Sequence, residues 1–396
     1  MITRLFRTSI VPTILALMPT LFAGFAAAQS VNYRLDLVPL PAGADSCEVI
    51  GMNSLGVVVG RFGGPIAGAG FSVGYVYDHP GMLGVPKALY LLPALIDVPG
   101  EWTSTGCWGI NDQGQVVGYM NKIVGGTEQR AGFVMDLATS PPVWKYLPTP
   151  AGSSHAFGLR INEYGDVVGV FNLGGDAIFG YFCNVANDST QYEILSDPST
   201  GLPLSFNASS PGLNNLGQVS GKTANGWFRL TPGVTLESIQ NANLGTVEAI
   251  NDWGVLCGRA SVVTGTTKGG RTTFTQMGCF YDTQITSVSG TFMAKDINNS
   301  NDVAMAFSPE ARPRFYRGNE GLMSIDPMLS PNTSTADMNY WKAGYVPAYR
   351  LTERDGVTNY PKIAGWLTRT TTTGSGKNKV TMYDRRIFVL TPEFAP

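Results

Sequence analysis

Apolar and polar positions repeat along this chain in one short pattern. Each copy begins with an apolar residue, which is followed by Asn-x-x-Gly. A short run that contains apolar residues then leads to a second Gly, as from Ile110 to Gly118. Repetition of this kind is the signature of a repeat architecture. A sixth copy has Asn301 in place of the first Gly, and a seventh is indicated only by Leu351 and Thr352. The five complete copies contain Asn53 and Gly56, Asn111 and Gly114, Asn162 and Gly165, Asn214 and Gly217, and Asn251 and Gly254.

The pattern predicts a tight hairpin turn between two strands. An Asn at the first turn position can hydrogen-bond to backbone two residues on, and Gly accepts the positive φ of a type I turn with a G1 bulge. Asn301 satisfies the same requirement, because Asn tolerates the left-handed region. We therefore expect these Asn and Gly residues to have a structural role.

An aromatic-rich run follows each turn and predicts a third strand, and a fourth segment then often ends in a break such as Leu147-Pro148. Successive turn positions lie between 37 residues (Asn214 to Asn251) and 58 residues (Asn53 to Asn111) apart. These spacings match propeller blades of ~40–50 residues that carry loop insertions. The third strands are expected at 71–77, 132–135, 180–182, 226–228, 279–281, 314–316 and 386–389.

The expected fold is an all-β, seven-bladed β-propeller of four-stranded antiparallel blades. The chain ends after a third-type strand near 384–391, whereas residues 31–40 resemble a fourth-type strand with no blade before it. Pairing of these two segments would close the ring and remove open sheet edges. Residues 29–396 are then a single β-propeller domain.

The first 28 residues have the three parts of a signal peptide. Arg4 and Arg7 are basic, residues 14–25 are apolar, and Ala26 to Ala28 form a small-residue cleavage site. The apolar stretch contains Pro19 and is shorter than the ~20 residues of a spanning helix. We expect cleavage after Ala28, no membrane span in the mature chain, and a secreted or periplasmic/extracellular location.

Composition narrows the possible partners. The net charge is -2 and no basic run occurs, which argues against binding to nucleic acid. After cleavage five cysteines remain, an odd number. Most are expected to be small buried hydrophobic residues, and a disulfide between Cys257 and Cys279 is an alternative for that pair. The five are Cys47, Cys107, Cys183, Cys257 and Cys279.

The turn and strand at Ile110 to Gly118, followed by Gly132 to Met135, resemble the bacterial secreted repeat family named for His-Ala-Phe, the HAF repeats. The resemblance spans nearly the whole mature chain and implies export and an extracellular, propeller-like fold. It implies no activity, because none is established for the family. One departure is that His155-Ala156-Phe157 precedes its turn here, whereas the family places those letters at the third strand.

Residues suited to catalysis are scarce. The chain has two histidines, His79 and His155, which are too few for a multi-histidine metal centre, and we expect no metal and no cofactor. A Gly-x-Ser-x-Gly match at 70–74 places Ser72 on an expected strand. A nucleophile elbow needs a strand, a sharp turn and a helix, so this match does not indicate a hydrolase.

The residues that lie two positions before each turn Asn belong to the innermost strands and form one row around the expected channel. Most of them are small. Charged residues interrupt this row and, with Glu248 and Lys295, would place charges around a central channel. Three roles are open: mutual salt bridges, an ion or polar-ligand site, or Glu248 and Asp296 as a carboxylate pair for glycoside chemistry. The row is Gly51, Gly109, Arg160, Gly212, Ala249, Asp296 and Arg350.

The longer connections are all expected on the face opposite the short turns. Insertions on one face of a repeat protein often mark the binding side, so Trp102, Tyr340 and Trp341 are candidate exposed anchors. The leading hypothesis is a secreted, non-enzymatic binding propeller for an unknown extracellular protein or glycan. The alternative is a carbohydrate-active hydrolase or lyase that uses channel carboxylates. The long connections are 62–70, 94–104, 121–130, 261–273, 327–343 and 369–379.

Overall fold

The computed structural model of the chain is built almost entirely of β-strands. It describes residues 30–395 except for 67–69, 98–101, 175–176, 187–190, 207–210, 225, 241–242, 289–292, 307–312, 319, 345–346 and 374–378. The expected signal peptide therefore lies outside the described residues. Within the described part of the chain, no helix is long and apolar enough to cross a membrane.

Strands that follow one another in sequence pair antiparallel in groups of four. One group is β2 (Ser46–Met52), β3 (Val58–Ile66), β4 (Gly70–Asp78) and β5 (Ala88–Leu91). The next is β6 (Ser104–Ile110), β7 (Gln115–Val124), β8 (Thr127–Asp136) and β9 (Val143–Tyr146). It is followed by β10 (His155–Ile161), β11 (Asp166–Asn172), β12 (Ile178–Asn184) and β13 (Glu193–Ile194). Then come β14 (Gly212–Leu213), β15 (Val219–Thr223), β16 (Gly226–Thr231) and β17 (Thr235–Ile239).

The second half of the chain continues the series. One group is β18 (Leu244–Ile250), β19 (Leu256–Thr266), β20 (Thr272–Tyr281) and β21 (Ile285–Ser287). Another is β22 (Met293–Ile297), β23 (Val303–Ala306), β24 (Arg314–Arg317) and β25 (Gly321–Ser324). The last strands are β26 (Ala348–Arg354), β27 (Pro361–Thr373) and β28 (Val380–Phe394), and β1 (Val31–Pro39) completes their sheet. The helices are α1 (Leu92–Leu95), η1 (Asp326–Met328) and α2 (Thr335–Ala343).

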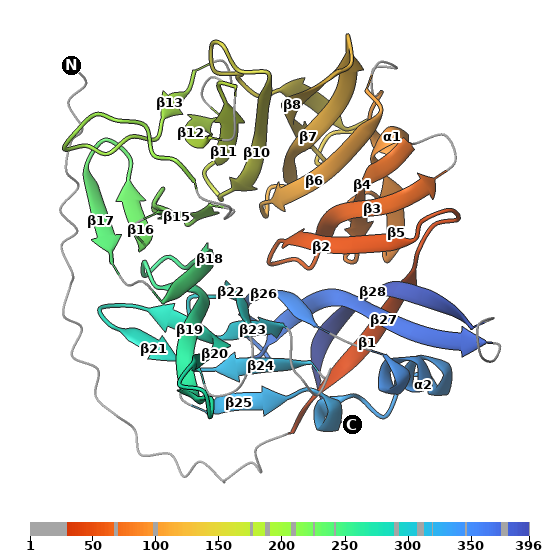
Figure 1. Ribbon diagram of the computed structural model, residues 1–396. Helices are drawn as coiled ribbons and strands as arrows, with labels where there is room; N and C mark the ends of the chain where they lie inside the picture. Colours follow the sequence, from red (N-terminus) through yellow and green to blue (C-terminus); the bar gives the residue numbers. More distant parts are fainter. Residues whose placement is uncertain are drawn as a thin grey trace, which may run out of the picture.

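Two pairings connect separate parts of the chain. β1 pairs antiparallel with β28 along its whole length, from Val31 opposite Phe394 to Pro39 opposite Arg386. A single parallel bridge between His155 and Arg130 joins the sheet of β6–β9 to that of β10–β13. The sheets stand around a common centre, with the first strand of each group innermost (Figure 1). These first strands contact one another in the order β2, β6, β10, β14, β18, β22, β26 and again β2.

Apolar cores fill the spaces between neighbouring sheets. One such core joins Val168 of β11 to Val219 of β15 and Phe228 of β16, with Phe206 from the connection between them. The small residues of the innermost strands are explained by crowding. A Cβ atom on Gly51 would lie 3.1 Å from the carbonyl oxygen of Trp108 in the next sheet.

The turn residues have the conformation that the sequence predicts. Gly56, Gly114, Gly165, Gly217 and Gly254 all have positive φ, and Asn301 has φ 59° in the same position. Gly has no Cβ and Asn tolerates the left-handed region, whereas most other residues would be strained at these positions.

Each turn asparagine also bonds to the next sheet, a role that the turn pattern alone did not indicate. Its Oδ1 accepts the backbone N–H four residues on, as from Val57 to Asn53, and its Nδ2 donates to the carbonyl of the next turn residue. We call this series the asparagine belt. Its inter-sheet bonds, 2.8 to 3.0 Å long, join Asn53 to Asn111, Asn111 to Asn162, Asn162 to Asn214, Asn214 to Asn251, Asn251 to Asn298, and Asn298 to Thr352.

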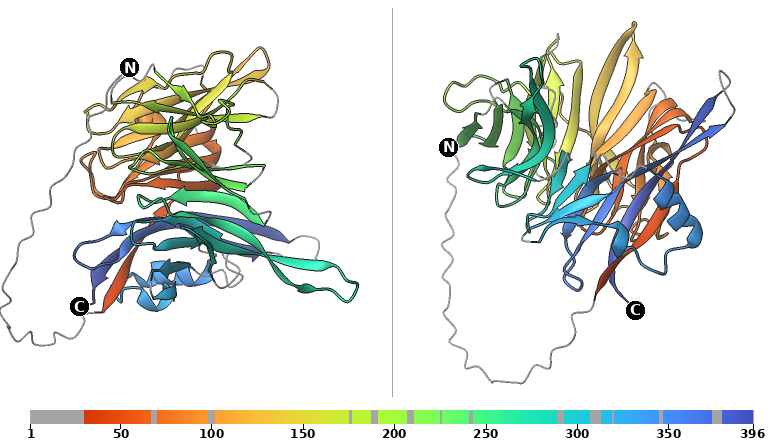
Figure 2. Two further views of the ribbon diagram at one scale, coloured as in Figure 1. Left: turned by 90° about the vertical axis from the view of Figure 1, so that its left-hand side faces the viewer. Right: turned by 60° about the horizontal axis from the view of Figure 1, so that its bottom comes forward.

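Several long connections are not loops, and this corrects the expected distribution of insertions. The segments 121–130, 261–273 and 369–379 were expected as loops, but their described residues mostly extend the hairpins β7–β8, β19–β20 and β27–β28. These hairpins project from the sheets (Figure 2). Continued antiparallel pairing satisfies the backbone groups that a loop would have to expose to water.

The cysteines are buried and free, which confirms the general expectation for them. Cys257 and Cys279 both have 0% exposure and form no disulfide. Burial raises the pKa of both thiols.

Candidate functional site

A recurrent β-bulge shapes the centre of the molecule. In six first strands the register with the second strand shifts at the residue three before the turn position. A bulge adds one residue to a strand and redirects its side chain. The bulged residues are Ile50, Trp108, Leu159, Glu248, Lys295 and Tyr349.

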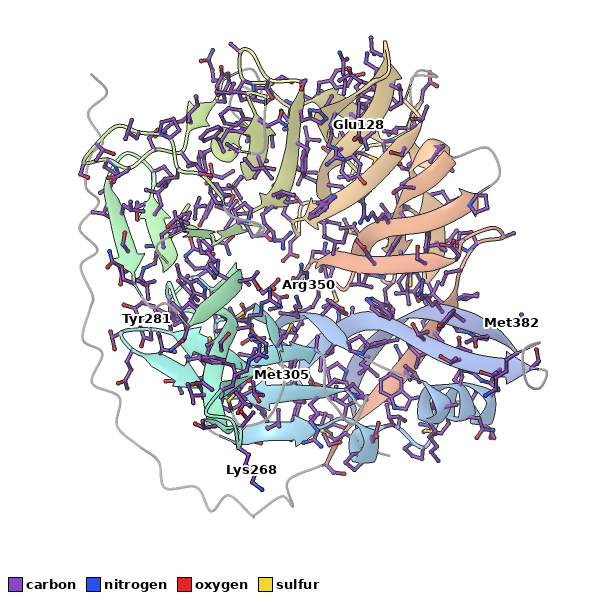
Figure 3. The ribbon with its side chains drawn as sticks, viewed as in Figure 1. Glu128, Lys268, Tyr281, Met305, Arg350 and Met382 are labelled. Atoms are coloured by element: carbon purple, nitrogen blue, oxygen red, sulfur yellow. The ribbon has the colours of Figure 1, made fainter. Side chains whose placement is uncertain are left out.

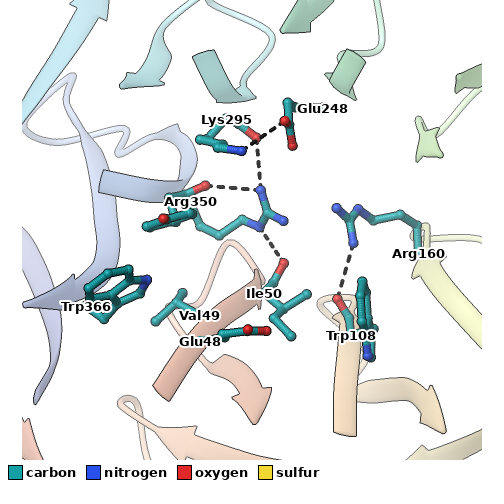
Figure 4. Close-up of a pocket in the computed structure, with 10 residues that line it drawn as sticks. Glu48, Val49, Ile50, Trp108, Arg160, Glu248, Lys295, Arg350 and Trp366 are labelled. Atoms are coloured by element: carbon teal, nitrogen blue, oxygen red, sulfur yellow. Dashed lines mark hydrogen bonds and ion pairs between the residues drawn. The ribbon is translucent and has the colours of Figure 1, made fainter. Parts of the chain in front are cut away.

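These bulges help to form a central cavity of about 320 Å³, lined in part by five of the bulged residues (Figure 4). Arg350 of β26 lies near the middle of the molecule, whereas Met382 lies at its outer edge (Figure 3). The full lining is Glu48, Val49 and Ile50 of β2, Trp108 of β6, Arg160 of β10, Glu248 of β18, Lys295 of β22, Tyr349 and Arg350 of β26, and Trp366 of β27.

Backbone carbonyls hold Arg350 in place. Its Nη1 donates to the carbonyl of Lys295 at 3.0 Å and to that of Tyr349 at 3.1 Å, and its Nε donates to the carbonyl of Ile50. These bonds fix one guanidinium between β2, β22 and β26. No carboxylate forms an ion pair with Arg350 among the residues that the structure describes.

Arg160 enters the same opening from the opposite side, with its guanidinium directed toward that of Arg350 (Figure 4). Its Nη1 donates to the carbonyl of Leu159 at 2.9 Å and more weakly to that of Trp108 at 3.5 Å. Burial and then the positive charge of Arg350 lower the pKa of Arg160 to about 9. The two guanidiniums are therefore close enough to repel each other.

Glu248 and Asp296, the carboxylate pair of one of the three open roles, differ in their position relative to the cavity. Glu248 lines the cavity and accepts from Lys295 at 2.9 Å and from the Thr246 hydroxyl at 2.8 Å. Asp296 is absent from the lining. The Asp296 carboxylate accepts from the backbone N–H of Leu351 at 3.2 Å. Burial raises the pKa of Asp296, while Arg350 and this N–H oppose that shift.

Mutual salt bridging accounts for only part of the charge at the centre. Glu248 pairs with Lys295, and Glu48 pairs with Arg61 through two bonds of 2.8 and 3.0 Å. Arg160 and Arg350 are held by carbonyl oxygens instead.

Aromatic rings complete the wall of the cavity. Trp366 stacks on Tyr349 with ring centroids 5.8 Å apart and an interplanar angle of 22°. Trp108 of β6, on the far side of the β2 sheet, lines another part of the opening. Sequence reasoning missed these three aromatic residues. Trp108 and Tyr349 lie one position before the row that was expected to face the channel, and Trp366 lies on the second strand of its sheet, β27.

The aromatic anchors expected on the long-connection face are less accessible than assumed. Tyr340 and Trp341 lie on α2, and Trp341 is fully buried against Phe388, with its indole N–H donating to Asp326. The expectation that these two are exposed is wrong, because a helix replaces the loop and turns its apolar side to the core. Trp102 is half-buried and donates from its indole nitrogen to the Tyr146 hydroxyl at 3.1 Å.

The histidines and the serine match have structural surroundings. His79 bonds to Asp36 of β1 at 3.0 Å, and the Ser72 hydroxyl donates to the carbonyl of Thr105. His155 bonds through Nδ1 to the Ser154 hydroxyl. Among the described residues, no three or more His, Cys, Asp and Glu side chains gather as a metal site would require.

No family model and no curated protein matches this chain. Solved structures that cover most of it include a virginiamycin B lyase from Staphylococcus aureus, with 12% identity and a TM-score of 0.44, over 91% of this chain and 99% of that chain. An alpha-L-arabinanase from Penicillium chrysogenum has 9% identity and a TM-score of 0.40, over 91% and 97%. TolB from Acinetobacter baumannii has 12% identity and a TM-score of 0.38, over 92% and 100%. Likeness at this level assigns no function to the cavity, and the resemblance to HAF repeats stays a prediction.

Proposed function

We propose that this protein is an exported, seven-bladed β-propeller that binds an extracellular protein or glycan in its central cavity without transforming it. Support for the blade count comes from the groups of four strands, with β1 as the fourth strand of the group that contains β26–β28. The contacts between first strands return from β26 to β2, as a closed ring requires.

Export and membership of the HAF-repeat family belong to the same proposal and rest on the sequence. The N-terminal 28 residues have the charge and apolar pattern of a signal peptide. Intact-mass measurement of protein from the medium or periplasm should give the mass of residues 29–396. A protein that retains Met1 in that fraction would refute cleavage.

The chemistry of the cavity lining carries the binding proposal. Both lining carboxylates, Glu48 and Glu248, are engaged by a cation. Glycoside hydrolysis needs two carboxyl groups that flank one bond, and Asp296 is not among the residues that line the cavity. Cationic and aromatic side chains that converge on one concave site are typical of ligand recognition.

Binding and turnover should be measured together on the mature protein. We expect a ligand from a panel of extracellular polysaccharides and their oligomers to bind without release of shortened or unsaturated products. Substitution of Arg350 by Gln should weaken that binding. Product formation that disappears in Glu248→Gln or Asp296→Asn would overturn the proposal in favour of a hydrolase or lyase.

A further inference from the structure

The cavity carries an excess of positive charge that its own carboxylates do not neutralise. Glu48 is bound by Arg61 and Glu248 by Lys295, so these pairs cancel. Arg160 and Arg350 remain, without an ion pair in the part of the chain that the structure describes. Asp296 offsets one of these charges at most, and it does so from outside the lining.

Hydrogen bonds to the protein fix the position of both guanidinium groups, and each group keeps N–H donors that make no such bond. Arg350 donates to protein acceptors through Nε and Nη1, and Arg160 does so through Nη1. The Nη2 of Arg350 and the Nε and Nη2 of Arg160 make no hydrogen bond to the described residues. A planar guanidinium matches a carboxylate in bidentate geometry, and a preorganised one loses little rotamer entropy on binding.

Repulsion between the two arginines gives an anion a further advantage. Burial, and after it the charge of Arg350, lower the pKa of Arg160 to about 9, so its positive charge is less favourable here than in water. An anion between the two groups would replace this repulsion by two attractive contacts. Attraction is stronger in a partly desolvated cavity than in bulk water.

The aromatic wall indicates more than a bare inorganic anion. Trp366, Tyr349 and Trp108 present ring surfaces around the charged centre, and such rings pack against the apolar face of a sugar. The volume of about 320 Å³ is at the small end of ligand sites. The site therefore suits one acidic sugar residue at the end of a chain or within a short oligomer.

We propose that the cavity binds an acidic oligosaccharide, with a uronate carboxylate between Arg160 and Arg350 and its sugar ring against the aromatic wall. This inference rests on the proposed binding function and names its ligand class.

Calorimetric titration can test it with oligomers of galacturonate, glucuronate and mannuronate, with the methyl esters of the same oligomers, and with sodium sulfate. We expect at least one uronate series to bind, its methyl ester to bind at least tenfold more weakly, and affinity to fall as salt rises. Arg160→Gln and Arg350→Gln should each weaken binding about tenfold or more. The matched control is Arg229→Gln, which removes a guanidinium that pairs with Glu237 outside the cavity.

Thermal melting should establish that each variant is folded. If a Gln variant is not folded, Arg350→Lys can replace it, because Lys keeps the positive charge but lacks the planar bidentate donor group of Arg. Weaker binding by Arg350→Lys, with the salt dependence retained, would still support the proposal. Equal binding of esters and acids would overturn the anionic ligand and leave the binding function intact. Binding of sulfate as tight as that of any uronate, or no binding of any uronate while another glycan binds, would also overturn it. Release of unsaturated or shortened uronate products would instead refute the proposed non-enzymatic function.

Discussion

At the scale of single residues, the turn asparagine has two separable roles. Its Oδ1 closes the turn within one sheet, and its Nδ2 joins that sheet to the next, as Asn53 does between Val57 and Asn111. The asparagines of the belt are almost completely buried, between 1% and 4% exposed. A buried amide whose groups are all bonded is stabilising, whereas loss of one partner leaves an unsatisfied group.

Substitution of Asn53 by Asp separates these roles, because Asp keeps an acceptor for Val57 but cannot donate at neutral pH. We expect the free energy of unfolding to fall by about 1–3 kcal/mol, the usual cost of an unsatisfied buried group. Chemical denaturation at pH 7 measures it. Asn332→Asp makes the same change at an exposed position and should stay within ~0.5 kcal/mol of wild type. Equal stability of both variants would contradict an inter-sheet role for the belt.

At the scale of elements, the sequence predicts regular parts well and irregular ones poorly. Strands and turns follow from local chemistry, because only Gly or Asn suits the positive φ at positions such as Gly114 and Asn301. The bulges have no comparable signature, since an extra residue changes the direction of a side chain without changing composition. For this reason the bulged residues Trp108 and Tyr349 were not expected in the lining of the cavity. The burial of Trp341 depends on packing against Phe388, which is distant in sequence.

The contact of β1 with the neighbouring sheet should depend on pH. Burial would raise the pKa of Asp36, but bonds from His79 and Lys87 outweigh it and lower the pKa to about 2. A carboxyl pKa that is lower in the folded state increases the free energy of unfolding. This contribution is complete above about pH 4 and disappears as the pH falls toward 2. The shift corresponds to about 2 kcal/mol. Asp36→Asn should therefore lose about that amount at pH 7 and progressively less below pH 4.

Unfolding of both proteins at pH 7, 4, 3 and 2 measures this difference. Asp282→Asn, at an exposed position, is the matched control and should show no such trend. A constant difference between wild type and Asp36→Asn at all four pH values would contradict the ionic contribution.

At the scale of the whole molecule, the asparagine belt is interrupted once. It runs from Asn53 to Thr352 but not from Thr352 back to Asn53, because threonine has no amide to donate. The Thr352 hydroxyl accepts from the backbone N–H of Lys362, as Oδ1 does elsewhere, and donates to the carbonyl of Glu353. Across this junction Lys362 donates to the carbonyl of Leu55, and Arg350 donates to that of Ile50.

Thr352→Asn should supply the missing bond to the carbonyl of Asn53. We expect the free energy of unfolding to rise by about 0.5–1.5 kcal/mol, the usual net value of a hydrogen bond. Thr352→Val, which is similar in shape but cannot accept from Lys362, should lower it. Denaturant titration compares the three proteins, and a lower stability for Thr352→Asn than for wild type would contradict the continuity of the belt across this junction.

The pairing of β1 with β28 has a consequence for biogenesis. β1 leaves the ribosome long before β28, its hydrogen-bonding partner, has been made. Until then β1 presents an unpaired strand edge, and Tyr33, which is fully buried in the finished molecule, has no core to enter. An unpaired edge can be taken by another chain. Nascent or truncated chains that lack β28 should therefore be the form of this protein most in need of a chaperone.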